Sequence, residues 1–235
     1  MSPSHSASGG AGGTWAILVA AGSGSRLGGD RPKAFAALAG RPLLAESLER
    51  LDLSEWIDAI VVAAPEGWEE PVILLAEELV ASKVASVVTG GATRAESVRN
   101  ALAEVREDAL VVLVHDAARP LVDDEILGRL LGRLAEGVDG VVPALPLSDT
   151  VKRVEGGVVV ETLPRDALVA VQTPQVFLAD RLRSAFSGDL TGATDCASVL
   201  ERAGGQIGVV SGDPRLAKVT TADDLRQVER LLAGS

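Results

Sequence analysis

Short apolar runs alternate with amphipathic stretches along this chain of 235 residues, and the alternation limits the folds that it can adopt. Runs rich in Val, Ile, Leu and Ala indicate buried strands, whereas the stretches between them have the apolar spacing of helices that cover a sheet. This order is typical of an α/β fold, with a mostly parallel twisted sheet flanked by helices. With 47% hydrophobic residues, the chain can bury one substantial core.

The pattern predicts where each element lies. Strands are expected at Trp15–Ala20, Ile57–Ala63, Val84–Val88, Leu110–His115, Gly140–Val142 and Gln206–Val210. Helices are expected at Leu43–Asp52, Gly67–Ala81, Arg94–Val105, Asp123–Glu136, Thr194–Ala203 and Ala222–Leu232. Thr93 and Asp123 are suitable N-caps, and Thr221 with Asp224 resembles a capping box. We expect a single domain over residues 14–235. Residues 1–13, rich in Ser, Gly and Ala without an apolar stretch, are expected to form a disordered tail and not a secretory signal.

Residues 149–162 interrupt this rhythm with two β-rich runs around Gly156-Gly157, which predicts a hairpin. Pro146 and Pro164 separate it from the main sheet, so the arm is expected over about residues 146–166. A two-stranded ribbon is marginally stable alone, and a projecting one would be covered by a second subunit. An antiparallel edge of the main sheet is the alternative that the pattern leaves open.

Composition excludes several classes of protein. The formal net charge of −11 argues against a nucleic-acid-binding protein, which usually carries a basic face. No apolar run reaches the roughly 18 residues of a membrane span. Cys196 is the single cysteine, which excludes an intrachain disulfide and a cysteine-based zinc site. These features favour a cytoplasmic protein.

The loop after the first expected strand carries the strongest chemical signal. It contains Gly22, Gly24 and Gly28, followed by the cations Arg26 and Lys33. Small residues let backbone N–H groups approach a polyanion, which the cations would neutralise. The spacing fits neither the dinucleotide fingerprint nor the Walker A loop. It therefore predicts a nucleoside triphosphate site of another kind, whereas a tight turn without a ligand would also explain the glycines alone.

Asp116 lies at the end of an expected strand, where open α/β sheets bind ligands. A lone carboxylate there suits Mg²⁺, which fills its remaining positions with phosphate oxygens and water. An N-cap or an ion pair with Arg119 is the other interpretation. His115 is expected to be a packed neighbour and not a ligand.

Two weaker signals accompany these motifs. The turn at Gly90-Gly91 precedes an expected helix, so its backbone groups could contact a base or a phosphate. Lys218 lies between apolar residues near the end of an expected short strand, and it would point into the site opposite Lys33. An exposed lysine on an edge strand is the alternative.

Taken together and in this order, the motifs resemble the 2-C-methyl-D-erythritol 4-phosphate cytidylyltransferase family of the non-mevalonate isoprenoid pathway. The resemblance runs from Trp15 to Leu232 and rests on V-H-D-A-A-R-P, G-G-x-x-R-x-x-S-V, L-S-D-T-V-K, Q-T-P-Q and K-V-T-T. The opening loop alone resembles nucleotidylyltransferases in general. The resemblance implies transfer of CMP from CTP to methylerythritol phosphate with Mg²⁺, and a homodimer whose β-arm embraces the partner subunit.

The resemblance also implies a role for individual residues. The CTP site would be lined by Ala20, Ala21, Gly22, Ser23, Gly24, Gly90, Gly91 and Ser97. The phosphates would be contacted by the catalytic residues Arg26, Lys33 and Lys218, and the metal by Asp116. Methylerythritol phosphate would be held by Arg119, Thr150, Arg165 and Thr173. Ala92 and Cys196 stand where an acidic residue is common in the family, so any contact made by such a side chain is absent here.

Two other functions compete with this one. A nucleotidylyltransferase acting on another sugar phosphate or on a pterin cofactor would share the opening loop, and its choice of base would depend on residues 90–97. A catalytically silent nucleotide-binding protein is the alternative from another class. The joint presence of Arg26, Lys33, Asp116 and Lys218 speaks against it, because binding alone would not need all four.

Overall fold

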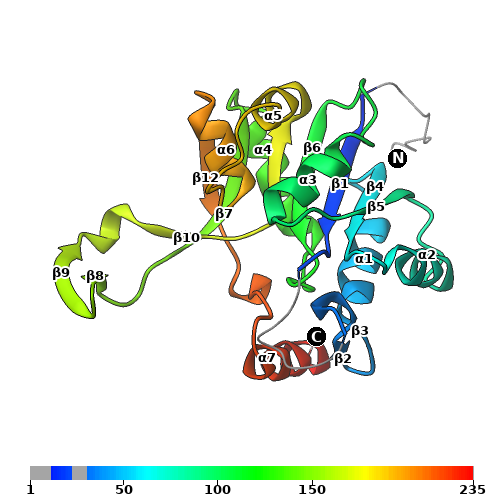
Figure 1. Cartoon of the computed structure of the whole chain (residues 1–235), viewed down its shortest axis with the longest axis horizontal. Coiled ribbons are helices and arrows are strands. Elements are labelled where there is room, and N and C mark those ends of the chain that lie inside the picture. The colour runs from blue at the N-terminus through cyan, green and yellow to red at the C-terminus, as the bar shows by residue number, and fades with distance from the viewer. Residues whose placement is uncertain (1–11, 23–30, 235) are drawn as a thin grey trace, which may run out of the picture.

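A computed structural model of the chain describes residues 12–22 and 31–234. Its centre is an eight-stranded sheet in the order β10-β7-β11-β6-β1-β4-β5 (Figure 1). The eighth strand, β12, lies outside this order and pairs with β7 on the edge opposite β11. The strands are β1 (Thr14–Val19), β4 (Ala59–Ala64), β5 (Val84–Thr89), β6 (Val111–Asp116), β7 (Gly140–Pro146), β10 (Val169–Val171), β11 (Gln175–Leu178) and β12 (Ile207–Ser211). Strands β1, β4, β5 and β6 are parallel, whereas β11 runs antiparallel between β6 and β7. The predicted α/β class with a mostly parallel sheet is confirmed.

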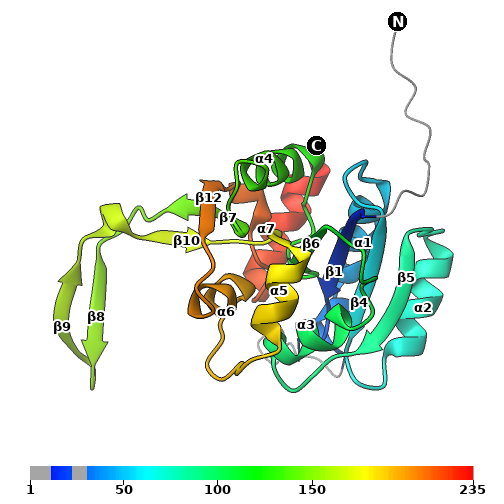
Figure 2. The same ribbon diagram turned by 90° about the horizontal axis from the view of Figure 1, so that it is seen from above.

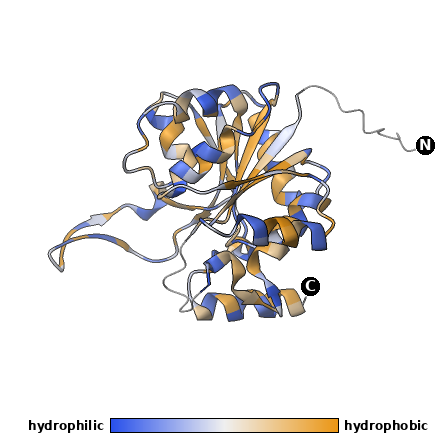
Figure 3. Cartoon of the chain, turned by 45° about the vertical axis from the view of Figure 1, so that its right-hand side comes forward, coloured by the Kyte–Doolittle hydropathy of each residue, from blue (hydrophilic) through white to orange (hydrophobic). Residues whose placement is uncertain are grey.

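Helices cover both faces of the sheet because successive strand residues point to opposite sides. In β1, Ala16 and Leu18 pack into one core cluster, and Trp15 and Ile17 pack into the other. The first cluster is closed by α1 (Leu43–Leu53), α2 (Glu69–Glu78) and α4 (Asp124–Leu134). The second is closed by α3 (Arg94–Leu102), α5 (Ala179–Phe186) and α6 (Cys196–Arg202), as Figure 2 shows from above. Hydropathy follows the same division, with apolar strands in the interior (Figure 3).

A third, smaller core lies beside the carboxyl edge of the sheet. Helix α7 (Ala222–Ala233) buries Val228 against Leu38 of the short β2 (Ala37–Leu38), which pairs with β3 (Arg41–Pro42). Leu43, Leu121 and Val219 complete this cluster. It joins the segment after Lys33 to the segment around Lys218.

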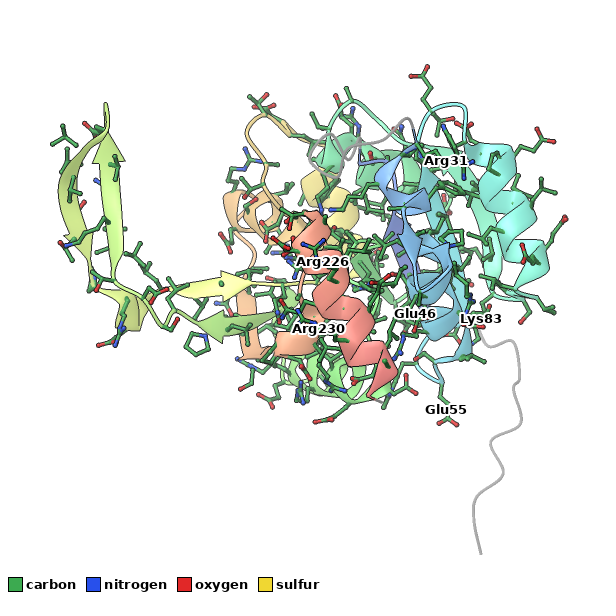
Figure 4. All side chains as sticks on the ribbon, turned by 90° about the horizontal axis from the view of Figure 1, so that it is seen from below. Arg31, Glu46, Glu55, Lys83, Arg226 and Arg230 are labelled. Atoms are coloured by element: carbon green, nitrogen blue, oxygen red, sulfur yellow. The ribbon has the colours of Figure 1, made fainter. Side chains whose placement is uncertain are left out.

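The predicted hairpin is present as β8 (Val151–Glu155) and β9 (Val158–Leu163), joined through Gly156-Gly157. Both glycines have positive φ, as the tight turn requires. The two strands form a sheet of their own, separate from the main one, so the edge-strand alternative is wrong. The arm projects from the body (Figures 1 and 2), and its side chains stand clear of the rest of the chain (Figure 4).

Several details differ from the sequence-based expectation. The second helix begins at Glu69 and not at Gly67, because Gly67 adopts a φ of +75° in the preceding turn. Lys218 is not on a strand but in the loop between the 3-10 turn Pro214–Leu216 and α7. Strand β11 and helix α5 were not predicted. Within the described residues, none of the helices combines the length and the apolar character needed to cross a membrane.

Candidate functional site

A cavity of about 320 Å³ opens at the carboxyl edge of the parallel strands β1 and β6. Ligands of open α/β sheets bind at this edge. The wall is formed by the ends of the two strands, the turn before α3, the 3-10 turn Lys33–Phe35 and the loop before α7. The sequence-predicted site residues that line it are Ala20, Ala21, Gly22, Lys33, Gly91, Ser97, Asp116 and Lys218.

Close packing explains the two glycines before α3. A Cβ atom at Gly90 would lie 2.2 Å from Cβ of Ala21, and one at Gly91 would lie 2.3 Å from Cβ of Glu96. No larger residue fits either position without a shift of the backbone. Ser97 holds the turn in place, since its Oγ accepts from the N–H of Gly91 at 3.0 Å and donates to the carbonyl of Thr93 at 2.9 Å. The turn therefore brings backbone groups to the cavity.

Asp116 is the charged centre of the cavity. Its Oδ1 accepts a hydrogen bond from Nε of Arg94 at 2.8 Å, and its Oδ2 accepts one from Nζ of Lys218 at 2.6 Å. Burial favours the neutral carboxyl, but the positive charges of Arg94 and then Lys218 outweigh it and hold the pKa of Asp116 well below its ordinary value. The group is therefore a carboxylate at neutral pH. Lys218 points into the cavity as expected, although from a loop, whereas its ion pair with Asp116 was not predicted.

An ionised carboxylate at a phosphate site has the donor chemistry that Mg²⁺ requires. Among the described residues, no group of three or more His, Cys, Asp or Glu side chains forms a metal-binding cluster. A metal ion at Asp116 would therefore complete its coordination with oxygens of a ligand and with water. That arrangement is normal for Mg²⁺, which dehydrates reluctantly and usually takes one or two carboxylates.

Arg94 is a site residue that the sequence interpretation missed. Thr93 and Glu96 form a full capping box, which fixes the start of α3 and sets Arg94 at its first position. From there Nε reaches Asp116, and Nη1 donates to Sγ of Cys196 at 3.4 Å. The remaining nitrogen, Nη2, is buried and has no hydrogen-bond partner among the described residues. The signal in the sequence was the arginine directly after the predicted N-cap of a helix that begins at a ligand-binding edge.

His115 is linked to Asp116 through Thr173, and both of its ring nitrogens are already engaged in hydrogen bonds. Its Nε2–H donates to the carbonyl of Arg119 at 2.9 Å, which leaves Nδ1 to accept from the hydroxyl of Thr173 at 3.2 Å. The same hydroxyl accepts from the N–H of Asp116 at 3.1 Å. Complete burial lowers the pKa of His115 to about 4. The expectation that His115 is a packed neighbour is confirmed.

Folding stability should therefore depend on the titration of His115. The pKa is about 4 in the folded chain against an ordinary 6.5, so between these values only the unfolded chain binds the proton. The free energy of unfolding should fall as the pH falls through this window, and this one group should account for about 3 kcal/mol of the loss.

Urea unfolding of the wild type and of His115→Asn at pH 7 and at pH 4 measures this contribution. The asparagine variant, although less stable at pH 7, should lose about 3 kcal/mol less on acidification than the wild type. Equal losses in the two proteins would show that His115 is protonated in the folded state.

A second cavity of about 490 Å³ lies on the other side of the same charged residues. Arg94, Asp116 and Lys218 line both cavities, and Arg119 and Thr173 line the second. Nη1 of Arg119 donates to the carbonyl of Leu216 at 2.5 Å, whereas its Nε is buried and finds no hydrogen-bond partner within the part of the chain that the structure describes. Burial lowers the pKa of Arg119 despite the attraction of Asp116. Two ligands could thus meet across Asp116 and its two cations.

The remaining predicted residues lie elsewhere. Gly90 packs behind the cavity wall against Ala21. Thr150 and Arg165 lie at the base of the arm and line neither cavity of the single chain; Arg165 donates to the carbonyl of Ser148 there. Ser23, Gly24 and Arg26 lie outside the described residues.

Comparison with known proteins gives one consistent result. A family model for 2-C-methyl-D-erythritol 4-phosphate cytidylyltransferase (IspD) matches residues 14–233. The enzyme of that name from Nocardia farcinica is 47% identical over 218 residues, which covers 92% of this chain and 93% of the relative. The crystal structure of the enzyme from Francisella tularensis is similar with a TM-score of 0.78 at 31% identity, over 93% of this chain and 99% of that one.

Proposed function

Because this chain belongs to the 2-C-methyl-D-erythritol 4-phosphate cytidylyltransferase family and is a nucleotidyltransferase, we propose that the two cavities around Asp116 are where it joins CTP to methylerythritol phosphate. The observation that carries this proposal is the set of charges shared by the two cavities. Arg94, Asp116 and Lys218 line both of them, so a phosphate group on either side meets the same cations.

The first cavity fits the nucleotide. Small residues at its rim, Ala20 to Gly22, leave backbone groups accessible to a triphosphate, and Lys33 contributes a positive charge. The tightly packed Gly90-Gly91 turn would hold the cytosine and ribose end. Arg26, Ser23 and Gly24 would extend this site from the segment outside the described residues.

Asp116 would hold Mg²⁺ together with phosphate oxygens of the nucleotide. Bound there, the ion would neutralise negative charge on the triphosphate. Lys218, which pairs with the same carboxylate at 2.6 Å, would place its positive charge beside the α-phosphate. Arg94 would keep the other carboxylate oxygen in place.

The reaction would be an in-line substitution at the α-phosphorus. A phosphate oxygen of methylerythritol phosphate forms the new P–O bond, and the bond from the α-phosphorus to the bridging oxygen breaks, so that pyrophosphate leaves with that electron pair. A phosphate monoester is already an anion near neutral pH, and no general base is needed. Catalysis then depends on positioning two polyanions and on stabilising charge at the α-phosphorus.

The second cavity fits methylerythritol phosphate. Arg119 and Thr173 line it beside Asp116. The buried Nε of Arg119, which has no partner among the residues that the structure describes, offers a donor to an anion. Thr150 and Arg165 would complete the site from the arm of a second subunit, because within one chain they line neither cavity. The exposed valines of the arm support this homodimer, since Val154, Val158, Val159 and Val160 are each more than half exposed.

Disrupting the apolar arm should separate the subunits. Val158→Asp with Val160→Asp places two charges on one face of β9, where they would be buried against the partner. We expect light scattering to report a monomer and the KM for methylerythritol phosphate to rise at least tenfold. Glu155→Gln at the tip of the same arm is the matched control and should remain a dimer. A dimer of undiminished activity in the double variant would contradict the arm as the interface.

One assay tests the proposed reaction directly. Incubation with CTP, Mg²⁺ and methylerythritol phosphate should give the cytidine diphosphate alcohol, detected by its mass, with one pyrophosphate per product. UTP, ATP and GTP should be poor substitutes, and EDTA should stop turnover until Mg²⁺ is restored. Preference for another nucleotide, or nucleotide binding without pyrophosphate release, would overturn the proposal.

A further inference from the structure

The segment Gln172–Gln175 connects β10 to β11, at the point where β6 and β7 diverge in the main sheet. Strand β10 ends at Val171 on β7, and β11 begins at Gln175 between β7 and β6. Both glutamine side chains are buried; Gln172 is 5% and Gln175 is 1% exposed. A buried amide needs hydrogen-bond partners, and the partners of these two amides lie on two other segments of the site.

Gln172 holds the loop that carries Lys218. Its Nε2 donates to the carbonyl of Asp213 at 2.9 Å, and its Oε1 accepts from the N–H of the same residue at 3.1 Å. Gly212 leaves room for this amide, because a Cβ atom there would lie 2.4 Å from Oε1 of Gln172. Lys218, five residues after Asp213, donates to the carboxylate of Asp116.

Gln175 holds the start of α6 in the same manner. Its Nε2 donates to Oδ2 of Asp195 at 2.9 Å, and its Oε1 accepts from the N–H of Cys196 at 3.2 Å. Cys196 in turn contacts the site, because its Sγ accepts a hydrogen bond from Nη1 of Arg94. Burial raises the pKa of the Cys196 thiol, so it meets Arg94 as a neutral group.

Between the two glutamines, the hydroxyl oxygen of Thr173 accepts a hydrogen bond from the backbone N–H of Asp116 at 3.1 Å. Three side chains of one four-residue segment are thus connected to the three charged residues at the centre of the site. We propose that Gln172 and Gln175 are positioning residues for nucleotidyl transfer, which set the placement of Lys218 and Arg94 around Asp116. This inference rests on the proposed function, to which it adds two residues that form part of the wall of the second cavity and whose amide groups are engaged in hydrogen bonds within the protein.

The physical reason is the steep dependence of transfer on geometry. A displacement of about 1 Å at the reacting groups can lower the rate on the order of a hundredfold, even when its origin lies away from the chemistry. A lysine on a loop is held less firmly than one on a strand, so its loop needs support from rigid elements. Gln172 provides two hydrogen bonds at one end of that loop, and the N–H of Val219 to the carbonyl of Ala118 at 2.8 Å provides support at the other.

A double-mutant cycle separates positioning from general stability. Gln172→Ala should lower kcat about tenfold while the KM for CTP changes less than about twofold. In a Lys218→Ala background, the same substitution should change kcat less than about twofold, because the group that it positions is gone. Gln172→Glu retains the acceptor but sets an oxygen against the Asp213 carbonyl, so it should reproduce the loss in a side chain of the same size. Gln227→Ala, on the exposed face of α7, should match the wild type.

Hydrogen exchange gives a readout that needs no turnover. In Gln172→Ala, backbone amides of residues 215–219 should exchange faster while those of α2 remain unchanged. Full kcat in Gln172→Ala, an equal tenfold loss in both backgrounds, or unchanged exchange over 215–219 would each overturn the positioning role. A wild type that does not turn over CTP with methylerythritol phosphate would instead overturn the proposed function, and the exchange measurement would still decide the role of Gln172.

Discussion

Lys218→Ala should lower kcat for cytidylyl transfer about a hundredfold, which corresponds to about 3 kcal/mol in the barrier. Lys218 lies 2.6 Å from Asp116 and lines both cavities, so its charge is available to groups that bind on either side. Negative charge at the α-phosphorus is stabilised only when transfer is under way, and the loss should therefore appear in kcat more than in the KM for CTP.

Steady-state kinetics with CTP and methylerythritol phosphate as varied substrates measure the effect. Lys83→Ala is the matched control, because Lys83 (labelled in Figure 4) donates to the backbone carbonyl of Ser54 at the end of α1 and lines neither cavity. That variant should keep kcat within about twofold of the wild type. A kcat near normal in Lys218→Ala would remove this lysine from the mechanism and would leave Lys33 as the candidate for its role.

Asp116→Asn should lower kcat by a factor on the order of a thousand, because it removes the carboxylate that we propose as the Mg²⁺ ligand and leaves two cations facing each other. The amide has nearly the same shape, so the cavity walls should remain, but Arg94 and Lys218 lose the negative charge that pairs them. Removing one partner of a buried ion pair leaves an uncompensated charge and commonly lowers the free energy of unfolding by about 3–5 kcal/mol. We therefore expect lower stability together with a weakened dependence on Mg²⁺.

Titration of activity with Mg²⁺, combined with thermal unfolding, separates these two effects. Asp139→Asn is the control, since Asp139 pairs with Arg181 on the surface and lies outside both cavities. It should leave the Mg²⁺ dependence unchanged. An Asp116→Asn variant that is folded, active and saturated at the same Mg²⁺ concentration as the wild type would show that the metal is held elsewhere.

Much of the fold followed from local patterns, because the parallel strands are nearly continuous apolar runs and the helices have clear starts. Thr93, expected as an N-cap, and Thr221, expected in a capping box, both form full capping boxes. The parts that were not predicted lack such local signals. Strand β11 has four residues and lies between two neighbours, β6 and β7, that the sequence does not bring together.

The site shows the same division. Asp116 could be placed because the end of a parallel strand has a known position in the sheet. Lys218 lines the cavity as expected, but it lies on a loop and not on a strand, since the loop is held by tertiary contacts with Gln172 and Arg119. Arg94 was missed because its role depends on Asp116 and Cys196, which are 22 and 102 residues away in the chain.

Helix α7 also determines when the protein can first become active during synthesis. Val228 closes the small core that holds Leu38, close to Lys33, and Val219, next to Lys218. The N–H of Ala39 adds a hydrogen bond to Glu229 of the same helix at 3.1 Å. A nascent chain that still lacks α7 also lacks the apolar contacts of Val228 and the hydrogen bond to Ala39, which hold the two lysine segments together. Full competence for catalysis is therefore expected only after α7 has left the ribosome, well after β6, which carries Asp116, has been made.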